Sequence, residues 1–225
     1  MHKLVIVGSG PGLAKTVAER FGAKGWRVVM MARNGERLAA EAGELRAQGV
    51  DAVPLVCDVT DLGRLDALIR SESEGGGIDL LIYNAAVIRP NTPIFDTAID
   101  TIVSDLTIDL VAGIVAARAA IPAMRDRGWG TIIFSGGELG FEPLPKLLTL
   151  GVGKAGLRNA AAALAQDEAC EKLRVAYVNI HAMIVNEVKG EIADLYYQIH
   201  TQPKDRHEWD FRYEHPYELP EGFEM

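Results

Sequence analysis

The chain has 225 residues, 48% of them hydrophobic and 24% charged, which is typical of one ordinary soluble globular domain. A formal net charge of −8 at pH 7 argues against a general nucleic-acid or anionic-membrane surface, because both need a basic face. The two cysteines have no paired spacing typical of a metal site or a disulfide framework, and the first apolar run is too short for a signal peptide or a membrane span. We therefore expect a cytoplasmic protein without a metal.

Apolar runs alternate with helical patterns along the whole chain. The expected strands are residues 3–7, 26–32, 50–57, 79–83, 131–134 and 174–180. The expected helices are residues 13–23, 36–48, 61–74, 96–124 and 149–172, followed by a helix near 192–201 and a short edge strand at 209–215. Gly25 and Gly49 stand where helices should end. This alternation predicts one α/β domain over residues 1–225, with a doubly wound parallel sheet covered by helices on both faces.

A glycine-rich turn, "VGSGPGLAK", follows the first strand and begins the first helix. The pattern G-x-G-x-x-G fails because its third position is Leu13, whereas Gly8-x-x-x-Gly12-x-Ala14 fits. Small residues let the backbone approach a pyrophosphate, whose charge is met by N–H groups at the helix start. The alternative is a tight turn without a ligand. The predicted cofactor contacts are Gly8, Ser9, Gly10, Pro11, Gly12 and Leu13.

The end of the second strand favours one nicotinamide cofactor over the other. An acidic residue there accepts hydrogen bonds from a ribose 2′-hydroxyl, but this chain has Arg33 and Asn34. We therefore expect a 2′-phosphate, hence NADP(H) rather than NAD(H), although Arg33 could also be a solvated surface charge. An S-adenosylmethionine methyltransferase also has a glycine turn after a strand, and Arg33 argues against it, because such enzymes normally have an acidic residue there.

Two further segments complete a resemblance to the short-chain dehydrogenase/reductase family. "CDVT" places Asp58 and Val59 where the family contacts adenine, and "YNAAV" places Asn84, Ala85 and Ala86 like the family's segment after the fourth strand. The resemblance implies a Rossmann-like sheet of about seven strands, with nicotinamide binding at the carboxyl ends of the strands. It also implies a small-molecule substrate and a homodimer or homotetramer.

The same resemblance indicates that most of the family's catalytic residues are replaced in this chain. Lys154 matches the family's lysine, which holds the ribose hydroxyls, but the tyrosine position four residues earlier is Leu150. The supporting serine position is Gly137, with Ser135 two residues away, and the asparagine of the central helix corresponds to Asp109. A carboxylate near Lys154 should raise the pKa of that lysine. The family's segment after the sixth strand is replaced by Ile180 and His181.

Few residues could replace the missing acid. The candidates are Ser135, Glu138 and His181; the adjacent Tyr196 and Tyr197 are better interpreted as packing residues. With Lys154 and Asp109, we therefore expect Ser135 and His181 to be catalytic. The favoured hypothesis is an NADP(H)-dependent oxidoreductase that transfers hydride to or from a small carbonyl or alcohol substrate. The alternative is a catalytically inactive NADP(H)-binding protein with a regulatory or structural role.

Overall fold

The computed structural model describes residues 1–89, 93–180 and 197–200. These residues form a seven-stranded sheet in the order β3-β2-β1-β4-β5-β6-β7. The first six strands are parallel and β7 is antiparallel to β6. The strands are β1 (Lys3–Val7), β2 (Arg27–Ala32), β3 (Ala52–Val56), β4 (Leu80–Tyr83), β5 (Thr131–Ser135), β6 (Arg174–Ile180) and β7 (Tyr197–His200). The predicted Rossmann-like sheet is thus confirmed.

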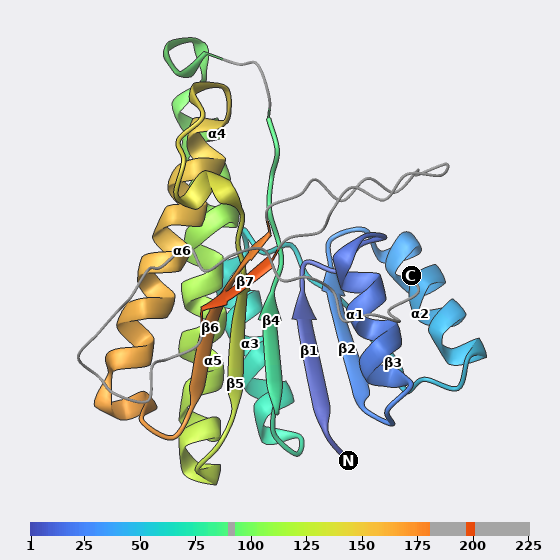
Figure 1. Ribbon diagram of the computed structural model, residues 1–225. Helices are drawn as coiled ribbons and strands as arrows, with labels where there is room; N and C mark the ends of the chain where they lie inside the picture. The colour runs from blue at the N-terminus through green and yellow to red at the C-terminus, as the bar shows by residue number, and fades with distance from the viewer. Residues whose placement is uncertain (90–92, 181–196, 201–225) are drawn as a thin grey trace, which may run out of the picture.

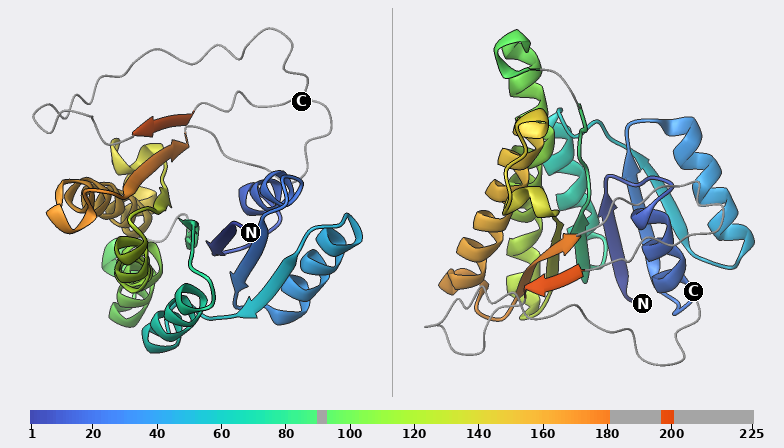
Figure 2. Two further views of the ribbon diagram at one scale, coloured as in Figure 1. Left: turned by 90° about the horizontal axis from the view of Figure 1, so that it is seen from below. Right: turned by 45° about the horizontal axis from the view of Figure 1, so that its top comes forward.

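The sheet is buried on both faces, which explains why its strands are continuously apolar rather than alternating. In β1, Val5 and Val7 pack with the helices after β3, β4 and β5, whereas Leu4 and Ile6 pack with the helices after β1 and β2. Figures 1 and 2 show these two helical layers on either side of the sheet. The strand order reverses direction at β1, so the turns after β1 and β4 meet at the carboxyl ends of the strands.

The helices agree closely with the expected positions. They are α1 (Leu13–Gly22), α2 (Gly35–Ala47), α3 (Leu62–Glu74), α4 (Ile99–Leu106), α5 (Ala112–Arg127) and α6 (Leu148–Gln166), with the short helical turns η1 (Ile94–Asp96), η2 (Thr107–Val111), η3 (Glu138–Gly140), η4 (Pro145–Leu147) and η5 (Glu168–Cys170). The expected helix 96–124 is a continuous stretch in which η2 is a π-helical turn. The expected helix 149–172 ends at Gln166, where Asp167 adopts extended backbone and caps η5.

The predicted helix near residues 192–201 is wrong. Tyr197–His200 forms β7, paired with Tyr177–Ile180. The segment is rich in aromatic and β-branched residues, and pairing with the free edge of β6 overrides its helical pattern. The edge strand expected at 209–215 lies outside the described residues.

The stretch Ile99–Arg127, formed by α4, η2 and α5, is long and apolar enough to cross a membrane by length and composition. Its alanines Ala112, Ala116 and Ala120 are fully buried in the core beside the sheet. A helix that packs into the core of a soluble protein has the same composition, so the stretch is weak support for a membrane span.

Candidate functional site

The glycine turn after β1 fits tightly against the segment after β4. Gly8 has a φ of +92°, and a Cβ atom at this position would lie 2.3 Å from the Ala85 nitrogen. The Asn84 side chain donates a hydrogen bond from Nδ2 to the Gly8 carbonyl oxygen at 3.0 Å. Only glycine permits this backbone and this approach. Two of the segments predicted to contact the cofactor are therefore joined into one structure.

The start of α1 offers N–H groups to an anion. Asn34 caps α2 and Asp61 caps α3, but the N-cap of α1 is Gly12, and no side chain among the described residues caps it. Ser9 is buried, and its hydroxyl has no hydrogen-bond partner in the described part of the chain. Uncapped N–H groups and the helix dipole favour a phosphate at this position. The turn therefore fits a dinucleotide pyrophosphate.

Two arginines stand near this turn. Arg33 follows β2 and is exposed. Arg37, one helical turn later, donates from its guanidinium to the Ser9 carbonyl oxygen at 3.2 Å. Sequence reasoning missed Arg37, whose guanidinium also forms an ion pair with Glu41 at 3.4 Å. Asn34 accepts a hydrogen bond from the Arg37 backbone nitrogen at 3.0 Å, so its side chain already has a structural role.

Asp58 stands at the same edge, after β3. Its Oδ1 accepts hydrogen bonds from the Thr60 backbone nitrogen at 3.0 Å and the Thr60 hydroxyl at 2.8 Å. These bonds, with a smaller contribution from the Arg33 charge, hold the pKa of Asp58 below its usual range. Asp58 is exposed and Val59 is half-buried. An ionised carboxylate here can accept a hydrogen bond from an adenine amino group.

Ala85 and Ala86 follow Asn84 at the end of β4. Ala85 is buried beneath the glycine turn, whereas Ala86 is exposed. The next residue, Val87, donates its backbone N–H to Asp109 Oδ1 at 2.8 Å. The segment after β4 is therefore fixed at one end to the glycine turn and at the other to η2.

A buried acid, Asp109, and a buried amine, Lys154, lie near each other behind this segment. Asp109 in η2 is 0% exposed, and its Oδ2 has no hydrogen-bond partner among the described residues. Lys154 on α6 is 7% exposed, and its Nζ donates to the Ser135 carbonyl oxygen at 2.9 Å. A Cβ atom at Gly153 would lie 2.4 Å from the Asp109 Cβ. Glycine next to the lysine therefore permits the close packing of α6 against η2.

Two opposing effects set the pKa of Lys154. Burial raises the pKa of Asp109 to about 6 and lowers the pKa of Lys154 to about 8. The Asp109 charge does raise the lysine pKa, as expected, but desolvation is the larger effect. The predicted effect of Asp109 is therefore present, and burial, which the sequence did not reveal, sets the net direction. The result is an amine that releases its proton more readily than an ordinary lysine.

The two positions where the family's hydroxyl groups are missing have distinct surroundings. Leu150 is buried one turn before Lys154 on α6, and its side chain cannot exchange a proton. Gly137 makes two backbone hydrogen bonds with the hydroxyl of Tyr177 on β6, at 3.1 Å from its nitrogen and 3.2 Å from its oxygen. Sequence reasoning missed Tyr177; the signal was the glycine pair Gly136–Gly137 after the neighbouring strand.

Two of the other candidate acids, Ser135 and Glu138, lie in the described part of the chain. Ser135 is buried, and it contacts Lys154 through its carbonyl oxygen. Glu138 is exposed at the start of η3. His181 and Tyr196 lie outside the described residues, as does the side chain of Tyr197. No cluster of three or more His, Cys, Asp or Glu in the described ranges could hold a metal ion.

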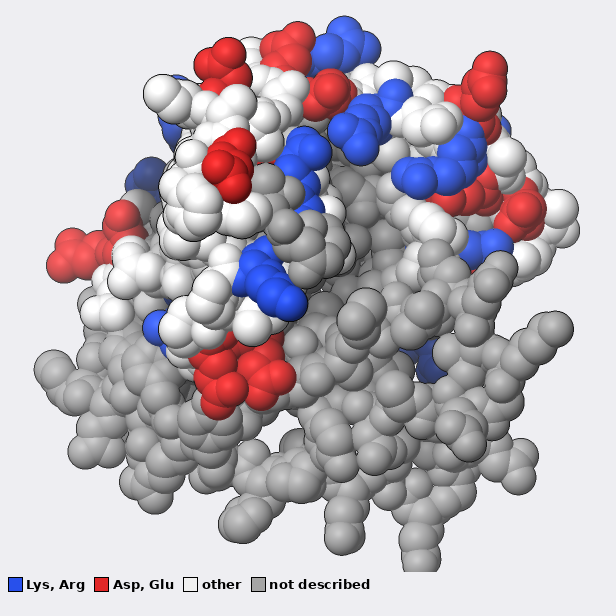
Figure 3. Space-filling model, turned by 90° about the horizontal axis from the view of Figure 1, so that it is seen from above, with Lys and Arg blue, Asp and Glu red and all other residues white. Residues whose placement is uncertain are grey.

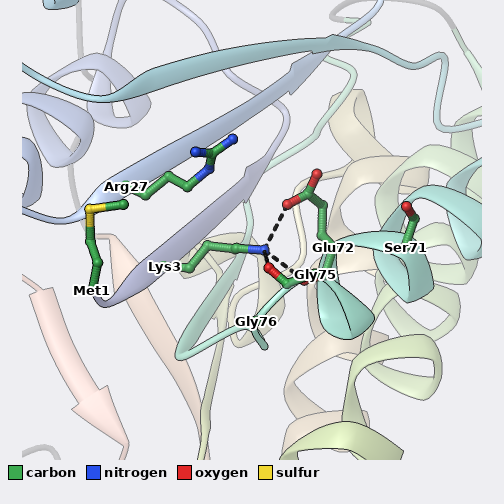
Figure 4. A pocket seen from close by; sticks show the side chains of 7 residues that line it. All are labelled: Met1, Lys3, Arg27, Ser71, Glu72, Gly75 and Gly76. Carbon is green, nitrogen blue, oxygen red and sulfur yellow. Dashed lines mark hydrogen bonds and ion pairs between the residues drawn. The ribbon is translucent and has the colours of Figure 1, made fainter.

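A cavity of ≈ 440 Å³ lies at the amino ends of β1 and β2, away from the glycine turn (Figure 4). It is lined by Met1, Lys3, Arg27, Ser71, Glu72, Gly75 and Gly76. Lys3 Nζ donates to the Glu72 carbonyl at 2.7 Å, to the Glu72 carboxylate at 3.0 Å and to the Gly75 carbonyl at 3.0 Å. All three ammonium protons are used to hold the end of α3, so this cavity has a structural explanation.

A second cavity, ≈ 270 Å³, opens between the segment after β4 and the start of α6. Asp105, 1% exposed, forms its floor and accepts from Arg89 Nε at 2.8 Å and from the Thr149 hydroxyl at 3.3 Å. Lys146 and Asp96 also line it. Acidic and basic groups are mixed over the described residues that are seen from this side (Figure 3). Leu148 and Thr149, at the start of α6, line the cavity, whereas Leu150 and Lys154 are not among its lining residues.

Known proteins are similar to this chain in sequence. The family model described as short chain dehydrogenase matches residues 2–192. A 2-dehydro-3-deoxy-L-rhamnonate dehydrogenase (NAD(+)) from Sphingomonas sp. is 29% identical over 154 residues, 68% of this chain and 60% of that protein. The 3-oxoacyl-[acyl-carrier-protein] reductase of Homo sapiens is 28% identical over 190 residues, 83% of this chain and 78% of the reductase. The chain thus spans well under two thirds of the Sphingomonas relative.

Solved structures agree with the fold. A metagenomic short-chain oxidoreductase in complex with NADP aligns with a TM-score of 0.75 and 25% identity, covering 80% of this chain and 83% of that one. A gluconate 5-dehydrogenase from Burkholderia cenocepacia J2315, in complex with NADP and tartrate, aligns with a TM-score of 0.71 and 25% identity, covering 78% and 69%. Structural neighbours of this chain therefore include nicotinamide-binding oxidoreductases.

Proposed function

The chain belongs to the short chain dehydrogenase family, and we propose that it is an NADP(H)-dependent oxidoreductase with a non-standard active site. The observation that carries this proposal is the buried Lys154, held by the Ser135 carbonyl beside Asp109, behind an intact nucleotide turn. The substrate is a small carbonyl compound or alcohol. The ≈ 270 Å³ cavity beside α6 supports a molecule of that size.

NADP(H) is preferred over NAD(H) in this proposal because of Arg33 and Arg37. Two guanidinium groups near the end of β2 suit a 2′-phosphate, since arginine forms charge-assisted hydrogen bonds with phosphate oxygens. Relatives differ in this respect, because the Sphingomonas dehydrogenase is named for NAD(+) and two structural neighbours hold NADP. The nucleotide contacts proposed are those expected from the sequence, with Arg37 added.

The cofactor, when bound, supplies hydride chemistry. In the reduction direction the protein must then donate one proton to the substrate oxygen. At neutral pH, Lys154 with a pKa of about 8 is mainly an ammonium, and Asp109 is mainly its counter-charge. When a substrate oxygen gains negative charge, Lys154 Nζ is the group that gives up a proton. The Ser135 carbonyl orients that amine. A proton donor with a pKa near the working pH is efficient.

The absence of a tyrosine at Leu150 and of a serine at Gly137 favours a second candidate. A chain with both substitutions could bind NADP(H) as a regulatory or structural ligand without turnover. A positioned general acid contributes about 10²–10⁴ in rate, so even an active protein should be slow. The two candidates share the nucleotide site and differ only in catalysis.

Measurement of nucleotide binding is the first test of both candidates. Purified protein is titrated with NADPH and NADH by nucleotide fluorescence, with Arg33→Asp as the comparison, and a panel of carbonyl substrates is then assayed for NADPH oxidation. Tight NADPH binding with slow turnover supports the oxidoreductase. Tight binding without turnover on any substrate supports the regulatory role. If neither nucleotide binds, both candidates are wrong.

We also propose a homo-oligomer in the cytoplasm. Large apolar side chains are exposed along α4, α5 and α6, namely Ile99 (77%), Val103 (56%), Ile114 (41%), Leu148 (42%) and Val152 (48%). Such a stripe is typical of a surface covered by another subunit. Cys57 and Cys170 are buried free thiols, which suits a reducing compartment.

A further inference from the structure

We propose that Tyr177 is a positioning residue for Lys154: its hydroxyl fixes the loop after β5 so that the Ser135 carbonyl stays against the lysine amine. This inference rests on the proposed role of Lys154 as the proton-bearing group. It concerns a side chain on β6, outside the positions that the family's catalytic set occupies.

The phenol of Tyr177 is buried against the loop after β5. Tyr177 is 2% exposed, and its hydroxyl accepts a hydrogen bond from the Gly137 nitrogen and donates one to the Gly137 oxygen. Burial raises the pKa of Tyr177, so the hydroxyl keeps the proton that it donates. The N–H and the C=O of Gly137 belong to two successive peptide groups, and both are bound to one side chain, which restrains the backbone at that residue.

The loop is shaped around the tyrosine ring. A Cβ atom at Gly136 would lie 1.9 Å from the ring, so any larger residue there would displace Tyr177. Gly137 is different: its φ is −169°, and the nearest atom to an added Cβ is the Ile180 oxygen at 3.7 Å. The space at Gly136 is therefore required by Tyr177, whereas a side chain at Gly137 is sterically permitted.

Two short routes connect the phenol to Lys154. Gly137 lies two residues after Ser135, whose carbonyl oxygen accepts from Lys154 Nζ at 2.9 Å. At the other end of the loop, a Cβ atom at Gly140 would lie 2.7 Å from the Tyr177 hydroxyl and 3.2 Å from the Lys154 carbonyl oxygen. The Tyr177 hydroxyl acts on a loop that backbone bonds also hold, because Gly136 N donates to the Val178 oxygen at 2.7 Å and Gly140 N donates to the Gly137 oxygen at 2.9 Å.

The sensitive readout is the titration of the lysine itself. The carbonyl of Ser135 stabilises the ammonium form, so loss of this contact should lower the pKa of Lys154 below about 8. Asp109 is the charged side chain that acts on Lys154, and it lies on η2, away from the loop. A change in the loop therefore alters one interaction and leaves the other in place.

The experiment is an NMR titration of protein labelled at the lysine side chains, with Lys154→Met used to assign the resonance. Tyr177→Phe keeps the ring and removes the hydroxyl, and Gly136→Ala displaces the ring. Gly137→Ala is the matched control. Thermal unfolding of each variant shows that it is folded. We expect Tyr177→Phe and Gly136→Ala to lower the pKa of Lys154, and Gly137→Ala to leave it unchanged.

An unchanged lysine titration in folded Tyr177→Phe would overturn the proposal and leave Tyr177 as a packing residue. An equal effect of Gly137→Ala would also overturn it, because the loop would then respond to any substitution. The titration needs neither nucleotide nor turnover. If the unmutated protein fails to bind NADPH, the proposed function fails while the Tyr177 test remains decisive. Where turnover exists, Tyr177→Phe should lower kcat about tenfold, with little effect on the Kd for NADPH.

Discussion

Lys154 Nζ donates its hydrogen bond to the Ser135 carbonyl oxygen, and not to the nearby Asp109 carboxylate, whose Oδ2 has no partner among the described residues. The Lys154 amine and the Asp109 carboxylate therefore interact through their charges, without a direct hydrogen bond. Burial shifts the pKa of each group toward neutrality, to about 8 for Lys154 and about 6 for Asp109. This is the arrangement expected where a protein handles a proton near neutral pH.

Replacing Lys154 distinguishes an enzyme from a nucleotide-binding regulator. Lys154→Ala removes the proposed proton donor and one ribose contact. In an enzyme, kcat should fall by about 10² or more, beyond any weakening of NADPH binding. In a regulator, only the Kd for NADPH should rise. Steady-state kinetics at saturating NADPH and fluorescence titration separate the two, with Lys24→Ala, an exposed lysine after α1, as the control.

The pH profile of turnover should report Lys154. In the reduction direction the ammonium is the active form, so kcat should fall as the pH rises through about 8. Asp109 raises the lysine pKa, so Asp109→Asn should move this decline to lower pH. The pH dependence of kcat at saturating substrate measures both profiles. If the decline stays at the same pH in Asp109→Asn, Asp109 has no electrostatic role in the reaction.

Much of this site could be predicted from sequence because its parts follow buried strands. Gly8, Asp58 and Asn84 each come just after a strand. Once the strands are predicted, these residues are therefore expected together at the carboxyl ends of the sheet. The pKa direction of Lys154 could not be predicted, since it depends on desolvation produced by packing against η2. Tyr177 was missed for a similar reason: its role depends on pairing between β5 and β6, and the glycine pair Gly136–Gly137 does not by itself identify the residue on the neighbouring strand.

Restoring the missing groups should increase activity. Gly137→Ser places a hydroxyl where the backbone is extended and an added Cβ has room. Leu150→Tyr places a phenol one helical turn before Lys154. Together they should raise kcat by about 10²–10⁴, the usual contribution of a positioned general acid. Gly137→Ser with Leu150→Phe is the control without the phenol. A double variant that folds, binds NADPH and gains no activity would show that the substrate reacts elsewhere.

Arg33 should decide the cofactor. Arg33→Asp replaces a cation with a group that repels a 2′-phosphate and accepts bonds from a 2′-hydroxyl. The Kd for NADPH should rise about tenfold to a hundredfold, because a charge-assisted hydrogen bond contributes about 1.5–3 kcal/mol. The Kd for NADH should stay equal or fall. Arg64→Ala removes an exposed guanidinium near β3 and serves as the comparison. Equal losses for both nucleotides would contradict recognition of the phosphate.

The apolar stripe on α4 and α6 should mediate assembly. Val103→Glu and Val152→Glu each place a charge on a side chain that is 56% or 48% exposed, so a folded monomer would tolerate either one. In a subunit interface, the buried charge would be desolvated without a partner, and association should weaken by a factor of ten or more. Sedimentation velocity over a range of concentrations measures this change. Trp129→Gln, 44% exposed at the other end of the fold beyond α5, should leave the assembly intact. Unchanged sedimentation in both glutamate variants would place any interface on a different surface.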